Sequence, residues 1–552
     1  MKILQINTYD IFGGAARAAY RLHQGLRISG VNSQMMVRYK SSNDNSVLDI
    51  APLLLDKNYD DDFFLKVAIQ EQYINNHRTE ITNTFFSLPY PGCDLAELSI
   101  VEQADIVNLH WVANYQSPIT LHKLFALNKP IVWTLHDQWA FTGGCHYSAG
   151  CKKYRQHCSA CPQLTDDPYD LATAILKDKI ELYKNANLTI VSPSQWLADC
   201  AKESALFEEV RVEVIPYSLD TEVFSPIPKT EAKIKLGLDP QTVTILFGAH
   251  SAIEKRKGFS ELYSAIQLCM SSPEFRQMVI NGYIKVLCFG NPSNDLQSIG
   301  IPVCSLGFLN SDEQVRVVYS AGDFFVLPSL EDNLPNTILE SMSCGTPVIA
   351  FDVGGIPDVI NEQTGIITPL GDVQRMSEAI SLLVSDAAHR DVLGKNCRKI
   401  MVEKYTLKIQ AQRYMGLYQD LLQPHKFLNQ TKAKVIIPET SAANASNPKL
   451  DETLSVSIDT NIGPNFQKVY EQILAKSLKE LAPIMQRQLQ KREKDCSEKV
   501  DTIKKISKNP EESVDTSKVT SYDIIWAMQS SISWRITAPL RWLSDKLGIF
   551  KK

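Results

Sequence analysis

The sequence predicts two doubly wound, Rossmann-like α/β domains followed by a C-terminal helical tail. Short apolar segments alternate with amphipathic ones up to about residue 405, which is typical of parallel sheets covered by helices on both faces. This alternation restarts near residue 214, and its character is lost after Leu422. With 552 residues, the chain is also too long for a single hydrophobic core.

The first predicted domain covers residues 1–213. Its glycine-containing stretch "GGAARAAYRLHQGLRISG" predicts a tight turn and then an Ala-rich helix that ends at Gly30. Short apolar segments bounded by turn residues predict its strands, namely "KILQINT", "SQMMVRYK", "ADIVNLHW", "PIVWTLHD" and "LTIVSPS".

The second predicted domain covers residues 214–405. Its buried-type strands are "TVTILFGAH", "IKVLCFG", "DFFVLPS" and "PVIAFDV". A long amphipathic pattern over 406–422 predicts a helix that closes the pair of domains. Residues 423–465 are rich in Ser, Asn, Ala, Thr and Pro and are predicted to be a flexible linker, and residues 466–552 are predicted to be a helical tail.

Composition excludes several classes of function. The net charge of -5 is small for this length and gives no reason to expect a nucleic-acid partner. No run of about 18 apolar residues predicts a membrane-spanning helix, and the start "MKILQINTYD" does not have the pattern of a signal peptide. The 12 cysteines are mostly scattered through apolar segments, which suits a reducing compartment, so we expect a cytoplasmic protein.

The stretch "SLEDNLPNTILESMSCGTPVIAFDVGGIPDVI", residues 329–360, places carboxylates around the start of a helix. It follows a predicted strand, so its turn lies at the carboxyl edge of a parallel sheet, where ligands bind in open α/β folds. The amides at the helix start attract anions and sugar oxygens. Glu340 lies further along the helix, and a carboxylate can accept two hydrogen bonds from a vicinal diol such as a ribose. For a single acid taken alone, a capped helix with a solvated side chain is the favoured interpretation, and it is the context that points to a ligand.

The order of residues in this stretch resembles the donor-site signature of glycosyltransferase family 4, a large retaining family with the GT-B fold. That signature has two Glu separated by seven residues, then Ala-Met-Ala-Cys-Gly, Pro-Val and a Gly-Gly turn. The resemblance covers residues 1 to about 422 and is strongest from Leu327 to Gly365. It implies two domains facing a cleft, with the nucleotide sugar bound mainly by the second domain and the acceptor by the first.

The resemblance also implies roles for individual residues. Glu340 would bind the ribose of the nucleotide. The acid before the helix would act at the donor sugar, and two residues compete for this position, because counting back eight residues from Glu340 gives Asp332 while Glu331 precedes it. The turn that would hold the donor through its amides comprises Asn333, Leu334, Pro335 and Asn336.

Other motifs match the family residue by residue. The Lys-Gly pair in "EKRKGF" assigns Lys257 to the donor diphosphate, and Arg256 would replace the Arg that the family has about six residues earlier. Gly13 and Gly14 correspond to the glycine loop near the diphosphate. The "WTLHD" segment matches the family's Thr-x-His pattern, which places His136 close to the transferred sugar.

Four cysteines occur within "CHYSAGCKKYRQHCSACP" in the first domain. Cys145, Cys151, Cys158 and Cys161 have the spacing C-x5-C-x6-C-x2-C, and four thiolates this close together suit a tetrahedral structural zinc. A redox pair or buried thiols would account for the same pattern. We expect this Cys-rich insert, residues 143–162, to shape the acceptor side.

The resemblance implies an enzyme that transfers a hexose-type sugar from a nucleoside-diphosphate sugar to a hydroxyl of a glycan or lipid-linked acceptor, without a cofactor for catalysis. The segment "SWRITAPLRWLSDKLGIFKK" combines Trp and aliphatic residues with cations, which predicts peripheral contact with the cytoplasmic membrane, and it resembles tails of bacterial cell-surface polysaccharide glycosyltransferases. Two other functions fit the residues: a GT-B nucleotide-sugar epimerase, and a non-catalytic scaffold recruited by its tail.

Overall fold

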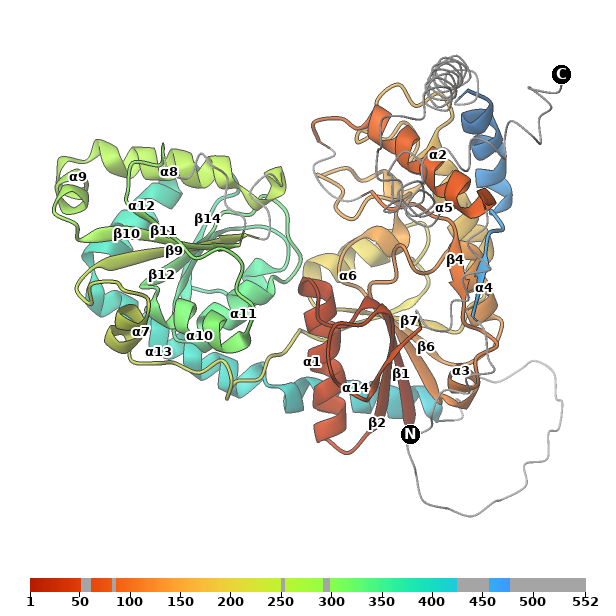
Figure 1. Cartoon of the computed structure of the whole chain (residues 1–552), viewed down its shortest axis with the longest axis horizontal. Helices are drawn as coiled ribbons and strands as arrows, with labels where there is room; N and C mark the ends of the chain where they lie inside the picture. Colours follow the sequence, from red (N-terminus) through yellow and green to blue (C-terminus); the bar gives the residue numbers. More distant parts are fainter. Residues whose placement is uncertain (51–60, 82–85, 250–253, 291–297, 424–455, 477–552) are drawn as a thin grey trace, which may run out of the picture.

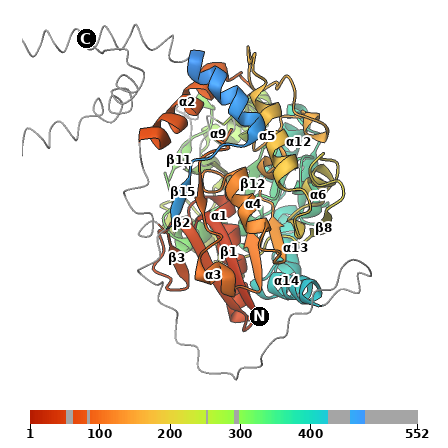
Figure 2. The same cartoon turned by 90° about the vertical axis from the view of Figure 1, so that its right-hand side faces the viewer.

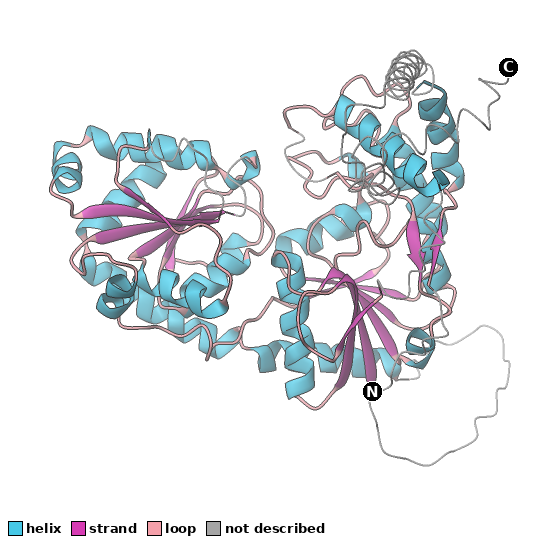
Figure 3. Ribbon diagram, in the orientation of Figure 1, coloured by secondary structure: helices cyan, strands magenta, loops and turns pink. Residues whose placement is uncertain are grey.

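The computed structural model describes residues 1–50, 61–81, 86–249, 254–290, 298–423 and 456–476. Two parallel sheets, each with helices on both faces, form two lobes (Figures 1 and 3). The predicted fold class is therefore confirmed. Most of the predicted linker and tail, including the cationic segment near the C-terminus, lies outside the described residues.

The first sheet has seven parallel strands in the order β3-β2-β1-β5-β6-β7-β8. Alternate residues of its strands enter two different cores: Ile3 and Ile106 pack on one face, and Leu4 and Val107 on the other. This two-sided burial explains why the strands are almost continuously apolar. The strands are β1 (Lys2–Tyr9), β2 (Asn32–Tyr39), β3 (Val47–Asp49), β5 (Ile106–Leu109), β6 (Ile131–Thr134), β7 (Leu188–Ser192) and β8 (Arg211–Val214).

The helices of this lobe begin with α1, which starts directly at the Gly13–Gly14 turn, as the sequence predicts. The helices are α1 (Gly14–Ile28), α2 (Asp61–His77), α3 (Ser99–Gln103), α4 (Pro118–Phe125), α5 (Leu171–Leu182) and α6 (Gln195–Lys202). Ser117 and Ser194 cap the N-termini of α4 and α6 by accepting backbone N–H bonds, which fixes where these helices begin.

The second sheet has six parallel strands in the order β11-β10-β9-β12-β13-β14. Its strands are β9 (Val243–Ala249), β10 (Ile284–Gly290), β11 (Val303–Ser305), β12 (Phe324–Leu327), β13 (Val348–Phe351) and β14 (Gly365–Thr368). Its helices are α7 (Lys229–Lys235), α8 (Phe259–Ser271), α9 (Pro273–Ile280), α10 (Asp312–Ala321), α11 (Asn336–Ser343), α12 (Val373–Ser385) and α13 (Ala387–Lys404).

Both sheets reverse their strand order at one point, between β1 and β5 in the first and between β9 and β12 in the second. Loops that leave the two strands at such a point diverge to opposite faces, and the crevice between them at the carboxyl edge is where ligands bind in this class of sheet. The Gly13–Gly14 turn follows β1, the basic loop with Lys257 follows β9, and the acidic turn with Asp332 follows β12.

The chain returns to the first lobe after completing the second. Helix α14 (Leu407–Leu422) packs against α1 and one face of the first sheet (Figure 1). The hydroxyls of Tyr414 and Tyr418 lie 3.0 Å from Thr134 Oγ1 and 2.9 Å from Asn108 Nδ2. This helix occupies residues within the predicted closing helix, 406–422.

Residues that the sequence analysis assigned to the linker and the tail also pack on the first lobe. Strand β15 (Ser457–Asp459) pairs antiparallel with β4 (Gly92–Asp94), and a helical stretch at residues 464–476 lies beside α2 (Figure 2). Phe466 is fully buried in the core of the first lobe. The predicted linker therefore ends earlier than residue 465, because its last residues form backbone pairs that composition alone does not reveal.

Candidate active site

The turn after β12 brings Asp332 against the basic loop after β9. Lys257 Nζ donates to Asp332 Oδ2 at 2.6 Å, and Arg256 Nη1 lies 3.3 Å from Oδ1. Burial opposes ionisation of Asp332, but the charges of Lys257 and Arg256 outweigh it and lower the pKa of Asp332 to about 2. Burial and the neighbouring Arg256 lower the pKa of Lys257 despite Asp332. Burial is the larger of the two causes, and an anion bound nearby would favour the charged form of Lys257.

Two glycines allow these loops to approach so closely. Gly258 and Gly354 both have positive φ, +71° and +59°. A Cβ atom on Gly258 would lie 1.7 Å from the carbonyl oxygen of Pro328, and one on Gly354 would lie 1.6 Å from that of Asp332. Both contacts are with backbone, so a side chain at either position would displace the acidic turn.

Glu331 and Asp332 point to different neighbours. The Glu331 carboxylate accepts the N–H of Ala149 at 2.9 Å, and burial raises its pKa. Tyr147, from the same insert, lies with its hydroxyl 3.4 Å from Asp332 Oδ1 and its ring 4.1 Å from the Arg256 guanidinium. Both candidates for the first acidic position therefore lie in the interface between the domains, and both contact the Cys-rich insert.

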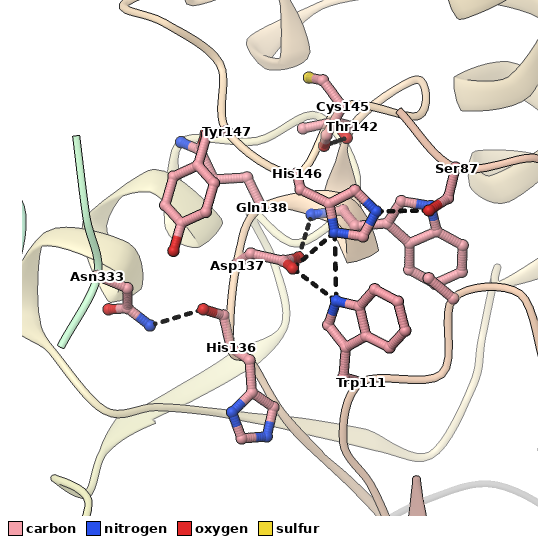
Figure 4. Close-up of polar contacts among 12 residues, drawn as sticks. Ser87, Trp111, His136, Asp137, Gln138, Thr142, Cys145, His146, Tyr147 and Asn333 are labelled. Atoms are coloured by element: carbon pink, nitrogen blue, oxygen red, sulfur yellow. Dashed lines mark hydrogen bonds and ion pairs between the residues drawn. The ribbon is translucent and has the colours of Figure 1, made fainter. Parts of the chain in front are cut away.

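The four residues of the predicted donor turn differ in the hydrogen bonds that they make and in the groups that remain for a ligand. Asn333 Nδ2 donates to the carbonyl oxygen of His136 at 3.1 Å (Figure 4), and its Oδ1 accepts from Ser194 Oγ at 2.6 Å. Asn336 Nδ2 donates to the carbonyl oxygen of Gly14 at 2.8 Å. Leu334 is buried in the core of the second lobe, and Pro335 has no N–H to donate.

Glu340 already has a cationic partner from the first domain. Arg21 Nη2 lies 2.7 Å from Glu340 Oε1, and Arg21 Nη1 is 3.3 Å from Asn336 Oδ1. The side chains of this ion pair are only 7% and 6% exposed. The predicted ribose-binding carboxylate is therefore held against helix α1, close to the Gly13–Gly14 turn.

His136 belongs to a buried chain of hydrogen bonds. Its Nδ1 lies 2.6 Å from the Tyr217 hydroxyl, its Nε2 lies 3.1 Å from His110 Nδ1, and His110 Nε2 lies 2.6 Å from Gln5 Oε1. Burial lowers the pKa of both imidazoles, that of His136 to about 4. Both rings are then neutral at pH 7. Because Gln5 Oε1 accepts, His110 donates from Nε2, His136 donates from Nε2, and Tyr217 donates to His136 Nδ1.

This arrangement differs from the predicted contact between the His136 imidazole and a sugar. Both ring nitrogens of His136 have partners within the protein. The group that His136 presents toward the second domain is its backbone carbonyl, which Asn333 reaches.

Asp137 lies next to His136 and organises the loop after β6. Its Oδ2 accepts from Trp111 Nε1 at 2.8 Å and from His146 Nδ1 at 2.6 Å (Figure 4). Burial opposes ionisation, but the interaction with His146 and the hydrogen bonds from Trp139 and Trp111 outweigh it and lower the pKa of Asp137. His146 Nε2 lies 2.6 Å from Ser87 Oγ. All three members of this Asp–His–Ser chain are at least nine-tenths buried, so the chain anchors the insert to the sheet.

The zinc prediction is not supported by the arrangement of the side chains. In the described part of the chain, no group of three or more His, Cys, Asp or Glu residues is placed to hold a metal ion. The four cysteines of the insert are free thiols around a cavity of about 20 Å³, and burial raises the pKa of Cys145, Cys158 and Cys161. Lys179 projects toward this region, but its Nζ donates to the carbonyls of Trp139 and Thr142. Cys145 and Cys158 are buried, whereas Cys151 and Cys161 are partly exposed.

Besides Tyr147, sequence reasoning did not identify Arg21, Ser194 and Tyr217, which also contact the predicted site. Arg21 follows Gly14 by seven residues, which is about two helical turns, so a cation on the same face of an Ala-rich helix was the available signal. Ser194 ends the "SPS" segment after β7, at the carboxyl edge of the sheet. Tyr217 contacts His136 only through the tertiary fold, and no local pattern predicts it.

No helix in the described ranges combines the length and apolarity that crossing a membrane requires.

Comparison with known proteins agrees with this geometry. Residues 242–386 match the family model for glycosyl transferases group 1. An Escherichia coli K12 protein named "Putative colanic acid biosynthesis glycosyl transferase WcaC" is 23% identical over 437 residues, which cover 76% of this chain and 100% of that protein. The sulfoquinovosyl transferase SQD2 of Arabidopsis thaliana is 30% identical over 246 residues, covering 42% of this chain and 45% of its own length.

Solved structures show the same fold. HepE of Anabaena, crystallised with UDP-glucose, matches with a TM-score of 0.52 and 14% identity, over 76% of this chain and 100% of that chain. Sucrose-phosphate synthase from Thermosynechococcus elongatus matches with a TM-score of 0.51 and 18% identity, over 76% and 99% of the two chains. Residues 242–386 are thus similar to the glycosyl transferases group 1, and the chain shares the two-lobed GT-B fold of these solved structures.

Proposed function

We propose that the protein is a retaining glycosyltransferase of family 4 that transfers a hexose-type sugar from a nucleoside-diphosphate sugar to a hydroxyl of a glycan or lipid-linked acceptor. The observation that carries this proposal is the pair of cations, Lys257 and Arg256, in the loop at the reversal point of the second sheet, opposite the Gly13–Gly14 turn of the first. Arg and Lys side chains bind phosphate oxygens through charge-assisted hydrogen bonds, so a diphosphate suits this pair of cations.

The geometry suits departure of a nucleoside diphosphate. Negative charge develops on the phosphate oxygen as the bond to the sugar breaks, and cations fixed in a largely buried site stabilise that charge. Lys257 and Arg256 have side chains only 21% and 15% exposed, so they retain much of their electrostatic strength. Glu340 would accept hydrogen bonds from the ribose, while Asp332 or Glu331 would lie beside the transferred sugar.

The relatives support the substrate class. The Escherichia coli relative is named for colanic acid biosynthesis, and the Anabaena structure holds UDP-glucose. A role in cell-surface polysaccharide synthesis on the cytoplasmic face of the membrane fits both these names and the cationic, Trp-containing segment at 530–552.

A panel of nucleotide sugars tests the donor. At least one member should raise the unfolding temperature of the protein, because a ligand that binds only the native state stabilises it. With that donor, the anomeric configuration of the product, read by NMR, should match that of the donor. Inversion would contradict retention. Conversion of the donor to an epimer in the absence of acceptor would identify an epimerase.

Lys257→Ala should weaken binding of a nucleoside diphosphate at least tenfold and leave nucleoside binding almost unchanged, since only the diphosphate carries the partner charge. Lys255→Ala is the matched control, because Lys255 lies two residues away with its side chain 62% exposed and paired to Glu80. Calorimetry should show little change for this control. Equal loss of both ligands in Lys257→Ala would remove the phosphate assignment.

A further inference from the structure

Tyr147, in the Cys-rich insert of the first domain, reaches the basic loop after β9 in the second domain. The Arg256 guanidinium lies over the Tyr147 ring, with its Cζ 4.1 Å from the ring centroid. The Tyr147 hydroxyl lies 3.4 Å from Asp332 Oδ1. The face of an aromatic ring attracts a cation, and the attraction is stronger where water is excluded. The side chain of Arg256 is only 15% exposed, so this contact is largely shielded from water.

The other contacts of Arg256 fix the plane of its guanidinium. Its Nε donates to Glu254 Oε1 at 2.9 Å, and its Nη1 donates to the carbonyl oxygen of Glu331 at 3.1 Å. Among the residues that the structure describes, none accepts a hydrogen bond from Nη2. With one face against Tyr147 and two nitrogens bonded, the guanidinium retains Nη2 as a donor. A guanidinium fixed in this way suits a phosphate oxygen.

Hydrogen bonds of the insert hold Tyr147 in place. The Tyr147 carbonyl accepts from Gln163 Nε2 at 2.6 Å, and the N–H of Ser148 donates to Gln138 Oε1 at 2.7 Å. The residue before Tyr147 is the histidine of the Asp–His–Ser chain that anchors the insert (Figure 4). A ring that is already fixed can orient its partner without a further loss of conformational freedom.

The Tyr147 hydroxyl does not bring a second negative charge to this place. Burial and the charge of Asp332 raise the pKa of Tyr147 well above its usual value, so the hydroxyl is protonated at neutral pH. It therefore faces Asp332 as a donor. Asp332 also accepts from Lys257 at 2.6 Å, and the two cations of the basic loop keep their positive charge available to an anionic ligand.

We propose that Tyr147 is a positioning residue for the donor, and that its ring orients the Arg256 guanidinium toward the phosphates of a nucleoside diphosphate. This inference rests on the proposed function, because it takes Arg256 as a residue that binds the donor. The insert then has a role besides the expected one on the acceptor side, since a side chain of the first domain completes the phosphate site of the second.

Calorimetry with UDP, ADP and GDP, and with the matching nucleosides, tests this role. Tyr147→Leu should weaken binding of the preferred diphosphate about tenfold and change nucleoside binding less than about twofold, because only the phosphates contact Arg256. Tyr147→Phe keeps the aromatic face and should retain most of the affinity. Tyr169→Leu is the matched control, because Tyr169 is a partly buried tyrosine of the first domain whose ring packs 6.0 Å from that of Tyr73.

A double-mutant cycle with Arg256→Gln separates positioning from a structural role. If the ring acts through the guanidinium, adding Tyr147→Leu to Arg256→Gln should change the diphosphate affinity less than about twofold. An equal loss in both backgrounds, or wild-type affinity in Tyr147→Leu, would overturn the positioning role and leave the proposed function standing. If none of these diphosphates binds the wild type, the proposed function fails and this inference fails with it. Should Tyr147→Leu not fold, Tyr147→Met allows the same comparison, because its flexible side chain fills irregular space.

Discussion

At the scale of single residues, burial decides how much an ion pair between the domains contributes. Helix α1 offers a direct comparison, because two of its arginines pair with the second domain. Arg21–Glu340 is 2.7 Å long with side chains 7% and 6% exposed, whereas Arg17–Asp312 is 3.2 Å long with side chains 33% and 48% exposed. Water screens the second pair but hardly reaches the first.

Arg21→Ala should therefore destabilise the protein far more than Arg17→Ala. Removing Arg21 leaves the Glu340 carboxylate buried without its cation, at a cost of about 3–5 kcal/mol. The loss for Arg17→Ala should be below about 1 kcal/mol. Urea unfolding followed by fluorescence measures both. Similar losses would show that the Arg21 pair is solvated in solution.

The lowered pKa of Asp332 predicts that the stability of the protein depends on pH. Its folded-state pKa of about 2 lies below the usual value of 3.8, so its stabilising contribution is present above about pH 4 and is lost as the pH falls toward 2. The stability gap between the wild type and Asp332→Asn should therefore narrow by about 1 kcal/mol between pH 6 and pH 3. Urea titrations across this range measure the gap. A constant gap would mean that Asp332 does not pair with Lys257 in solution.

At the scale of elements, the sequence predicted most of what a local pattern can determine. Continuous apolar runs predicted the parallel strands, and the Gly13–Gly14 turn and the acidic turn were located by their strand–turn–helix context. Contacts made only across the interface were not predictable, because no spacing links Arg21 to Glu340 or Tyr147 to Asp332. The cysteine spacing predicted thiols that lie close together, and all four line one small cavity, but no group of three or more His, Cys, Asp or Glu among the described residues is placed to hold a metal ion.

One glycine in each of the turns after β13 and β14 allows a test of how closely the turn after β13 packs on the acidic turn. Gly354 and Gly371 have similar positive φ, +59° and +75°, but a Cβ on Gly354 would meet the Asp332 carbonyl, and one on Gly371 would meet nothing within 4 Å. Gly371→Ala should cost about 1 kcal/mol from the backbone conformation alone. Gly354→Ala should cost several times more and weaken donor binding by moving the acidic turn. Thermal unfolding and nucleotide titration of the two variants check this, and equal effects would contradict it.

At the scale of the whole molecule, segments remote in sequence complete the first domain. Helix α14 covers one face of its sheet, and residues 456–476 return to its other core. Asp178 fixes this second return, because its carboxylate accepts the N–H groups of Asn465 at 2.8 Å and Phe466 at 3.1 Å, together with the Tyr90 hydroxyl at 3.0 Å. Residues 456–476 are thus part of the first domain, which ends later in the sequence than the second.

Phe466→Ala should consequently destabilise the first domain although the residue lies more than 40 positions after Leu422. Phe466 is fully buried, with its ring centroid 5.4 Å from that of Tyr90, and removing such a ring costs about 3–5 kcal/mol through lost burial and the cavity left behind. Phe308→Ala removes the same side chain at a position 57% exposed in the second domain and should cost less than about 0.5 kcal/mol.

Nucleotide binding, which we assign mainly to the second domain, should survive in Phe466→Ala at temperatures below the unfolding temperature of the first domain. Thermal unfolding monitored by tryptophan fluorescence, with nucleotide titration in parallel, measures both effects. If Phe466→Ala unfolds at the temperature of the wild type, residues 456–476 do not pack on the first domain in solution.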